Sequence, residues 1–268
     1  MTTLMAIGGA INPKKPTVLE EFIRRAGGDL ARVVILPQAS ALKDTGQYYE
    51  AVFRTLGAED ALALEFHQRG EAGAPKQLEA IRGATGIFIA GGNQMRLSVS
   101  FGGTPLEAEL LSAYRRGCVI AGTSAGAAIL SKTMIAYGKN GPTPREGILH
   151  FAPGLGFTEK FTFDQHFRQR DRLGRLVYAV ATHPGILGVG VDEDTAAIVE
   201  NDEAITVCGS GAVTIVDGQE ITGTDVAEIE RRGPIAVSNL KVHILTDTCV
   251  YNGRTRQVRL PQKTLLVE

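Results

Sequence analysis

The first half of the chain alternates between short apolar runs and longer segments with helical spacing. The apolar runs are four to six residues long and end in glycine, proline or polar turns, as buried strands do. Between them, apolar residues recur every three or four positions, as on one face of a helix. This pattern predicts strands at 4–7, 32–36, 61–66, 86–90 and 118–121. It predicts helices at 18–25, 48–56, 76–82 and 105–116.

This alternation is typical of an α/β fold, a doubly wound, mostly parallel sheet with helices on both faces. In such a sheet, ligands bind at the carboxyl ends of the strands. The glycine turns 8–9, 91–92 and 122–126 each follow a predicted strand, so we expect them to meet in one cleft. After residue 200 the pattern changes to short β-rich segments separated by Gly, Asp and Asn turns. We therefore expect one α/β domain over 1–268, with extra C-terminal β-strands at 201–268 as a β-rich extension of it.

Composition and charge exclude several classes of protein. The chain has 268 residues, of which 44% are hydrophobic and 21% charged, with a formal net charge of −1, so neither nucleic acid nor an anionic membrane is an expected partner. Because no run approaches bilayer-spanning length and the N-terminus lacks a basic leader, a cytoplasmic protein is expected. The three cysteines form no C-x-x-C and are interpreted as buried thiols. No metal-ligand spacing occurs, so neither metal nor cofactor is expected.

The turn after the fifth predicted strand carries the strongest chemical signal. It reads GTSAG, a G-x-S-x-G motif at a strand-to-helix turn, which presents a serine hydroxyl at a sharp elbow. The following helix N-terminus would supply free N–H groups to an oxyanion. Ser124 is therefore the candidate nucleophile, and an incidental serine in a Gly/Ala-rich turn is the alternative. Nucleotide binding is disfavoured, because neither G-x-G-x-x-G after the first strand nor a P-loop pattern occurs.

A serine nucleophile needs a base and an acid that orients the base. His166 lies between an alternating apolar strand and an arginine-rich segment interpreted as a helix, which makes it the first candidate base, with His150 second. The other histidines are interpreted as solvated, helix-capping and core residues, and they are His67, His183 and His243. The acid is expected within 192–194, at the end of a predicted strand at 187–191. This Ser…His…acid order differs from the Ser…acid…His order of α/β-hydrolases.

Four segments together resemble the cyanophycinases, a serine-peptidase family with a fold like that of the class I glutamine amidotransferases. The segments occur in the family's order and are AGGNQ (90–94), GTSAGAA (122–128), FDQHFRQRDRLGRL (163–176) and GVDEDTA (190–196). GTSAG is widely shared, whereas the 163–176 block is far more specific. The resemblance covers nearly the whole chain. It implies that Ser124 is the nucleophile, His166 the base and Glu193 the acid.

The resemblance also implies a substrate, cyanophycin, which is a poly-aspartate backbone with arginine attached through each β-carboxyl. The products would be β-Asp-Arg dipeptides, and the enzyme would be a homodimer. Each branch carries a carboxylate, which arginines recognise, and a guanidinium, which Asp164 would receive. The implied substrate contacts are Gln94, Asp164, Gln165, Arg170, Arg172 and Arg175. The implied oxyanion donors are the N–H groups of Gly92 and Ala125.

Two other interpretations stay open at this point. The aspartyl dipeptidases share the GxSAG elbow and cleave short Asp-X peptides, but they lack the FDQHF–RQRDR block found here. A non-catalytic amidotransferase-like module that binds a small ligand would need no triad. The presence of all three candidate triad residues favours an enzyme over such a module.

Overall fold

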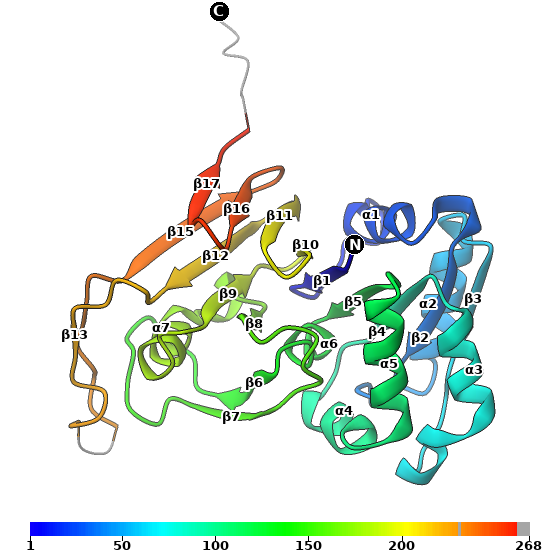
Figure 1. The fold of residues 1–268 in the computed structure, drawn as a ribbon, viewed down its shortest axis with the longest axis horizontal. Helices are drawn as coiled ribbons and strands as arrows, with labels where there is room; N and C mark the ends of the chain where they lie inside the picture. The colour runs from blue at the N-terminus through cyan, green and yellow to red at the C-terminus, as the bar shows by residue number, and fades with distance from the viewer. Residues whose placement is uncertain (230–231, 262–268) are drawn as a thin grey trace, which may run out of the picture.

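The computed structural model describes residues 1–229 and 232–261, so residues 230–231 and 262–268 of the predicted C-terminal extension lie outside the described residues. Its main feature is a nine-stranded sheet in the order β17-β16-β11-β10-β1-β5-β4-β2-β3 (Figure 1). The parallel half consists of β1 (Thr3–Ile7), β5 (Val119–Thr123), β4 (Gly86–Ile89), β2 (Arg32–Leu36) and β3 (Asp60–Ala63). The antiparallel half consists of β10 (Thr195–Glu200), β11 (Ala204–Gly209), β16 (Val250–Asn252) and β17 (Gln257–Arg259).

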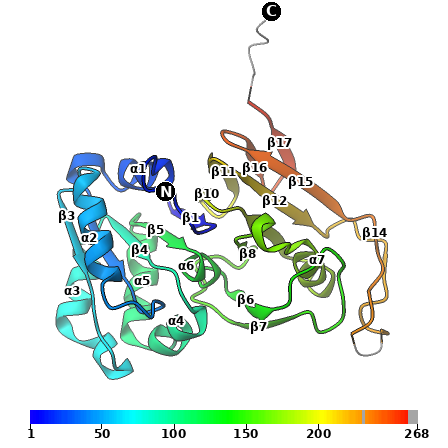
Figure 2. The ribbon, with the colours of Figure 1, turned by 180° about the vertical axis from the view of Figure 1, so that it is seen from behind.

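Helices cover both faces of the parallel half (Figures 1 and 2). One layer consists of α1 (Thr17–Arg25) and α2 (Thr45–Thr55). The other consists of α3 (Pro75–Gly83), α4 (Gln94–Phe101), α5 (Pro105–Arg115) and α6 (Ala125–Ala128). Strand alternation divides the core between the layers, since Met5 and Ile7 pack with the first and Leu4 and Ala6 with the second. The predicted α/β class is therefore confirmed, and the antiparallel half continues the parallel half in one mixed sheet.

A second sheet of four strands stands beside the first, in the order β15-β12-β9-β8. Its strands are β8 (Phe161–Gln165), β9 (Leu187–Val191), β12 (Ala212–Asp217) and β15 (Lys241–Thr246). Helix α7 (Leu173–Thr182) connects the parallel pair β8 and β9 and packs on β9 and β12. The C-terminal strands β11, β16 and β17 thus extend the first sheet, and β12 and β15 extend the second.

The remaining elements are short, and the hydrophobic pattern predicted none of them. They are two strand pairs, β6 (Thr133–Gly138) with β7 (Leu149–Pro153) and β13 (Gly223–Thr224) with β14 (Val237–Ser238), and three 3-10 turns, η1 (Gly28–Leu30), η2 (Arg69–Gly73) and η3 (Arg168–Arg170). All three cysteines are free thiols. Within the part of the chain that the structure describes, no helix combines the length and the apolar character that a membrane crossing requires.

Candidate active site

The three candidate catalytic residues follow three different strands and meet at one place. Ser124 follows β5 of the nine-stranded sheet, whereas His166 and Glu193 follow β8 and β9 of the four-stranded sheet. The Ser124 Oγ lies 2.9 Å from the His166 Nε2, and the His166 Nδ1 lies 2.6 Å from a Glu193 carboxylate oxygen. The structure therefore joins serine, imidazole and carboxylate in one hydrogen-bonded chain.

The elbow at Ser124 depends on the glycines at either side of it. Ser124 has φ 53° and ψ −113°, a backbone conformation that residues other than glycine rarely adopt. A Cβ on Gly122 would lie 2.0 Å from the carbonyl oxygen of Gly126, and one on Gly126 would lie 2.1 Å from that of Ile89. Neither position has room for a side chain, because the backbone segments pass in direct contact. The motif thus fixes a strained turn with the serine at its tip.

His166 is held by the turn that follows β1. The His166 N–H donates to the carbonyl of Gly8 at 2.8 Å. A Cβ on Gly9 would lie 2.4 Å from the His166 ring, and Gly9 has φ 99°, so glycine is required there for two reasons. His150, the other candidate base, lies on β7 and stacks on Tyr137. Of the two candidates, only His166 contacts the serine.

The surroundings of His166 keep its imidazole neutral. The side chain is 11% exposed, and this burial lowers the pKa of His166 below its ordinary value of 6.5. The hydrogen bond to Glu193 raises the pKa of His166, and the positive charge of Arg170 lowers it, but burial is the largest effect. At neutral pH the imidazole can therefore accept a proton.

The three adjacent acids have three different surroundings. Asp192 is buried and accepts a hydrogen bond from the Arg168 N–H at 3.0 Å. Asp194 accepts from the Asn12 N–H at 2.9 Å. Glu193 alone faces the imidazole. Asp192 is only 3% exposed, because backbone N–H groups at this strand end need a buried acceptor.

The arginines of the RQRDR segment do not lie along one helix, contrary to the sequence-based expectation. The 3-10 turn η3 ends at Arg170, Asp171 has φ 49°, and α7 begins only after Arg172. The left-handed residue breaks the helical repeat, so the arginines point to different places. Arg170 is exposed, whereas Arg172 and Arg175 are 7% and 4% exposed.

The two buried arginines bind the carboxylate that we expected to receive the substrate's guanidinium. Asp164 is 1% exposed and accepts two hydrogen bonds from Arg175, one of them at 2.6 Å, and one from Arg172 at 3.2 Å. Arg172 also donates to the side chain of Gln165 at 3.0 Å and to its backbone carbonyl. We call these four residues the Asp164 cluster. Burial lowers the pKa of Arg172 to about 10, which still leaves it charged at neutral pH.

The other expected contacts are Gln94, Gly92 and Ala125. Gln94 donates its amide N–H to carbonyls of β6, including that of Ile135 at 3.2 Å, so this group ties α4 to β6. Gly92 has φ 142°, and a Cβ there would lie 2.1 Å from the carbonyl oxygen of Ala39. Ala125 is the first residue of α6, where a backbone N–H has no partner within the helix. Gly92 and Ala125 stay predictions as oxyanion donors.

A cavity of about 490 Å³ opens in front of the candidate triad, lined by Ser124 and His166. Its opposite wall is the loop before α2 and the first turns of that helix. Among the described residues that line it, Asp44 is the only one with a carboxylate, and Tyr48 exposes 53% of its surface. Neither residue could be predicted from the sequence, because no motif marks them. Nor do the described residues contain a group of three His, Cys, Asp or Glu suited to a metal ion.

Comparisons with known proteins identify the family of this chain. The family model described as "Peptidase family S51" matches residues 4–207. The chain is 40% identical over 259 residues to a protein named cyanophycinase from Synechococcus elongatus, covering 96% of this chain and 80% of that one. It is 38% identical over 261 residues to a cyanophycinase from Geminocystis herdmanii, covering 96% and 95% of the two chains.

Solved structures share the fold at lower identity. A peptidase from an acI-B1 Actinobacterium superposes with a TM-score of 0.61 at 18% identity, covering 91% of this chain and 97% of that one. A putative peptidase E protein from Listeria monocytogenes EGD-e gives a TM-score of 0.53 at 18% identity, covering 79% and 100%. These likenesses extend the agreement from sequence to fold. The chain belongs to peptidase family S51.

Proposed function

We propose that the protein is a serine-type cyanophycinase, which hydrolyses cyanophycin to β-Asp-Arg dipeptides. The observation that carries the proposal is the hydrogen-bonded chain from the Ser124 Oγ through His166 to Glu193. The substrate follows from the relatives named cyanophycinase, which are 38–40% identical over most of this chain. A cytoplasmic homodimer stays a prediction.

In the proposed mechanism, the Ser124 Oγ attacks a carbonyl carbon of the polymer backbone and its proton passes to the His166 Nε2. Glu193 accepts a hydrogen bond from the His166 Nδ1, which fixes the tautomer and stabilises the imidazolium that forms. The N–H groups of Gly92 and Ala125 stabilise the oxyanion of the tetrahedral intermediate. The imidazolium then protonates the leaving amine. Water attacks the resulting ester with the same imidazole as base.

The charges around the catalytic cavity support an arginine-containing substrate. Since Asp164 is occupied by the protein's own arginines, we assign the guanidinium of the branch to Asp44, with the ring of Tyr48 as a stacking surface. Arg170 is exposed, and its positive charge lowers the pKa of His166, so we assign it the branch carboxylate. We assign the Asp164 cluster the role of positioning His166, which follows β8 directly.

The test compares the wild type with Ser124→Ala on three substrates: soluble cyanophycin, an Asp-X dipeptide and casein. We expect the wild type to release β-Asp-Arg from cyanophycin only. The variant should fold normally and lose on the order of 10⁶ in kcat. A variant that keeps a tenth of the activity would overturn the serine mechanism. Hydrolysis of the dipeptide in preference to cyanophycin would instead identify an aspartyl dipeptidase.

A further inference from the structure

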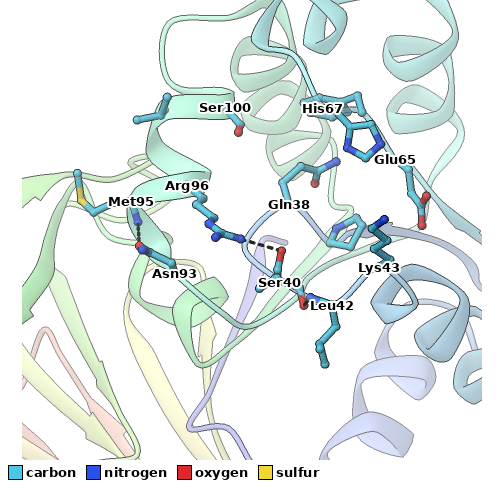
Figure 3. Close-up of a pocket in the computed structure, with 14 residues that line it drawn as sticks. Gln38, Ser40, Leu42, Lys43, Glu65, His67, Asn93, Met95, Arg96 and Ser100 are labelled. Atoms are coloured by element: carbon cyan, nitrogen blue, oxygen red, sulfur yellow. Dashed lines mark hydrogen bonds between the residues drawn. The ribbon is translucent and has the colours of Figure 1, made fainter.

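A second and larger cavity adjoins the catalytic one. It has a volume of about 850 Å³, which is ample for a ligand the size of a drug molecule (Figure 3). Its walls are the loop 37–44 between β2 and α2, the segment after β3, and the first turns of α4. Ser40 and Leu42 line both cavities. This loop therefore lies between the larger cavity and the one that holds Ser124.

The lining of the larger cavity combines apolar surface with unpaired charges of both signs. Phe66 and Val99 contribute apolar surface, and Val99 is 64% exposed. Lys43, Glu65 and Arg96 line it as well, and Figure 3 shows their side chains among the lining residues. Among the described residues, none of these three forms an ion pair with another side chain. A ligand with both an anionic and a cationic group would satisfy them.

The loop 37–44 between the two cavities is hydrogen-bonded to the turn that carries Gly92, a proposed oxyanion donor. Arg96 donates to the carbonyl of Ser40 at 3.1 Å, which fixes the loop against α4. The Asn93 N–H donates to the carbonyl of Ala39 at 3.0 Å, directly after Gly92. A ligand in the larger cavity would therefore press on the same backbone that forms the catalytic site.

We propose that the larger cavity is a second polymer subsite, which binds an Asp-Arg branch of the substrate at a distance from the scissile bond. The inference rests on the proposed function. Glu65 would bind the guanidinium of this branch, Lys43 its carboxylate, and the apolar lining the aliphatic stem of the arginine. A polymer with its scissile bond at Ser124 can continue past Ser40 and Leu42 into this space, whereas a single short segment fills only the catalytic cavity.

The experiment measures kcat/KM for long cyanophycin and for its shortest cleavable segment, and takes the ratio of the two values. The ratio cancels any loss of folded protein or of catalytic power, because these lower both values equally. The double variant Lys43→Gln/Glu65→Gln is compared with Lys241→Gln/Glu220→Gln, which removes the same charges from an exposed pair between β15 and the turn after β12. Thermal denaturation checks that each variant is folded.

We expect the long-to-short ratio to fall roughly tenfold in the cavity variant, since two partly exposed charge contacts are lost. In the control variant the ratio should stay within about twofold of the wild type. An unchanged ratio in the cavity variant, with cyanophycin still hydrolysed, would overturn the second subsite alone. A wild type that hydrolyses neither substrate would overturn the proposed function and the subsite with it.

Discussion

Replacing Asp164 by asparagine tests whether the Asp164 cluster is structural or contacts the substrate. The carboxylate is 1% exposed and is the partner of both Arg172 and Arg175, which are almost as deeply buried. Asparagine has nearly the same shape and keeps one acceptor oxygen, but it removes the negative charge. Two buried guanidinium groups would then face each other with no counter-ion in the cluster.

The expected cost follows from this burial. At an effective dielectric constant of 20, one ion pair at about 4 Å contributes on the order of 4 kcal/mol. Removing one partner of a buried pair is known to cost roughly 3–5 kcal/mol. A domain is typically stable by only about 5–15 kcal/mol, so Asp164→Asn should remove a large fraction of the free energy of unfolding. The melting temperature should fall by about 6–10 °C, at roughly 2 °C per kcal/mol for a chain of this size.

The assay is urea denaturation followed by circular dichroism, combined with kcat and KM on cyanophycin. Asp60→Asn is the matched control, because Asp60 faces Arg54 in an exposed pair and should cost less than about 1 kcal/mol. If the free energy of unfolding of Asp164→Asn lies within about 1 kcal/mol of the wild-type value, the structural role is refuted. A raised KM at unchanged stability would show instead that Asp164 receives the substrate, as the sequence suggested.

Three further predictions concern the chemistry. Burial lowers the pKa of His166, and the base must be neutral to accept a proton. Activity should therefore fall with decreasing pH only below about 6.5, which the pH–rate profile of the wild type tests. Glu193→Gln should lower kcat by up to roughly 10⁴-fold. It should also move the acid limb of the pH–rate profile to lower pH, because the Glu193 carboxylate raises the pKa of His166. An acid limb at the wild-type pH would argue against contact between Glu193 and His166. Arg170→Ala should raise KM for cyanophycin and move the acid limb of the pH–rate profile to higher pH, because the positive charge of Arg170 lowers the pKa of His166. If neither KM nor the acid limb changes, Arg170 has no role in the site.

The parallel half of the fold could be predicted from the sequence because local patterns determine it. The predicted strands 4–7, 32–36 and 86–90 match β1, β2 and β4 within one residue at either end. These strands are buried on both faces, and their apolar runs are therefore unbroken. The G-x-S-x-G turn could also be predicted from the sequence. Its glycines are required by close backbone contacts, of Gly122 with Gly126 and of Gly126 with Ile89 on the neighbouring strand β4.

The pairing of strands and the partners of charged side chains could not be predicted in the same way. Nothing in the apolar pattern of β8 or β9 tells that they belong to a separate sheet, because that depends on pairing with distant segments such as β12. The arginine spacing suggested a helix, but one left-handed residue, Asp171, interrupts it. Asp164 pairs with residues eight and eleven positions away only because the chain folds back there.

The division of the proposed triad between two sheets has a consequence for how activity is lost. Ser124 is fixed by the nine-stranded sheet and its glycines, while His166 and Glu193 move with the four-stranded sheet. The turn after β1 fastens the two together, through Gly8 to His166 and through Gly9 to the N–H of Asp194. A small shift of one sheet along the other would separate the serine from its base while leaving each sheet intact. The rate of hydrolysis therefore reports how the two sheets are aligned. It should fall at a lower denaturant concentration than the one at which either sheet unfolds.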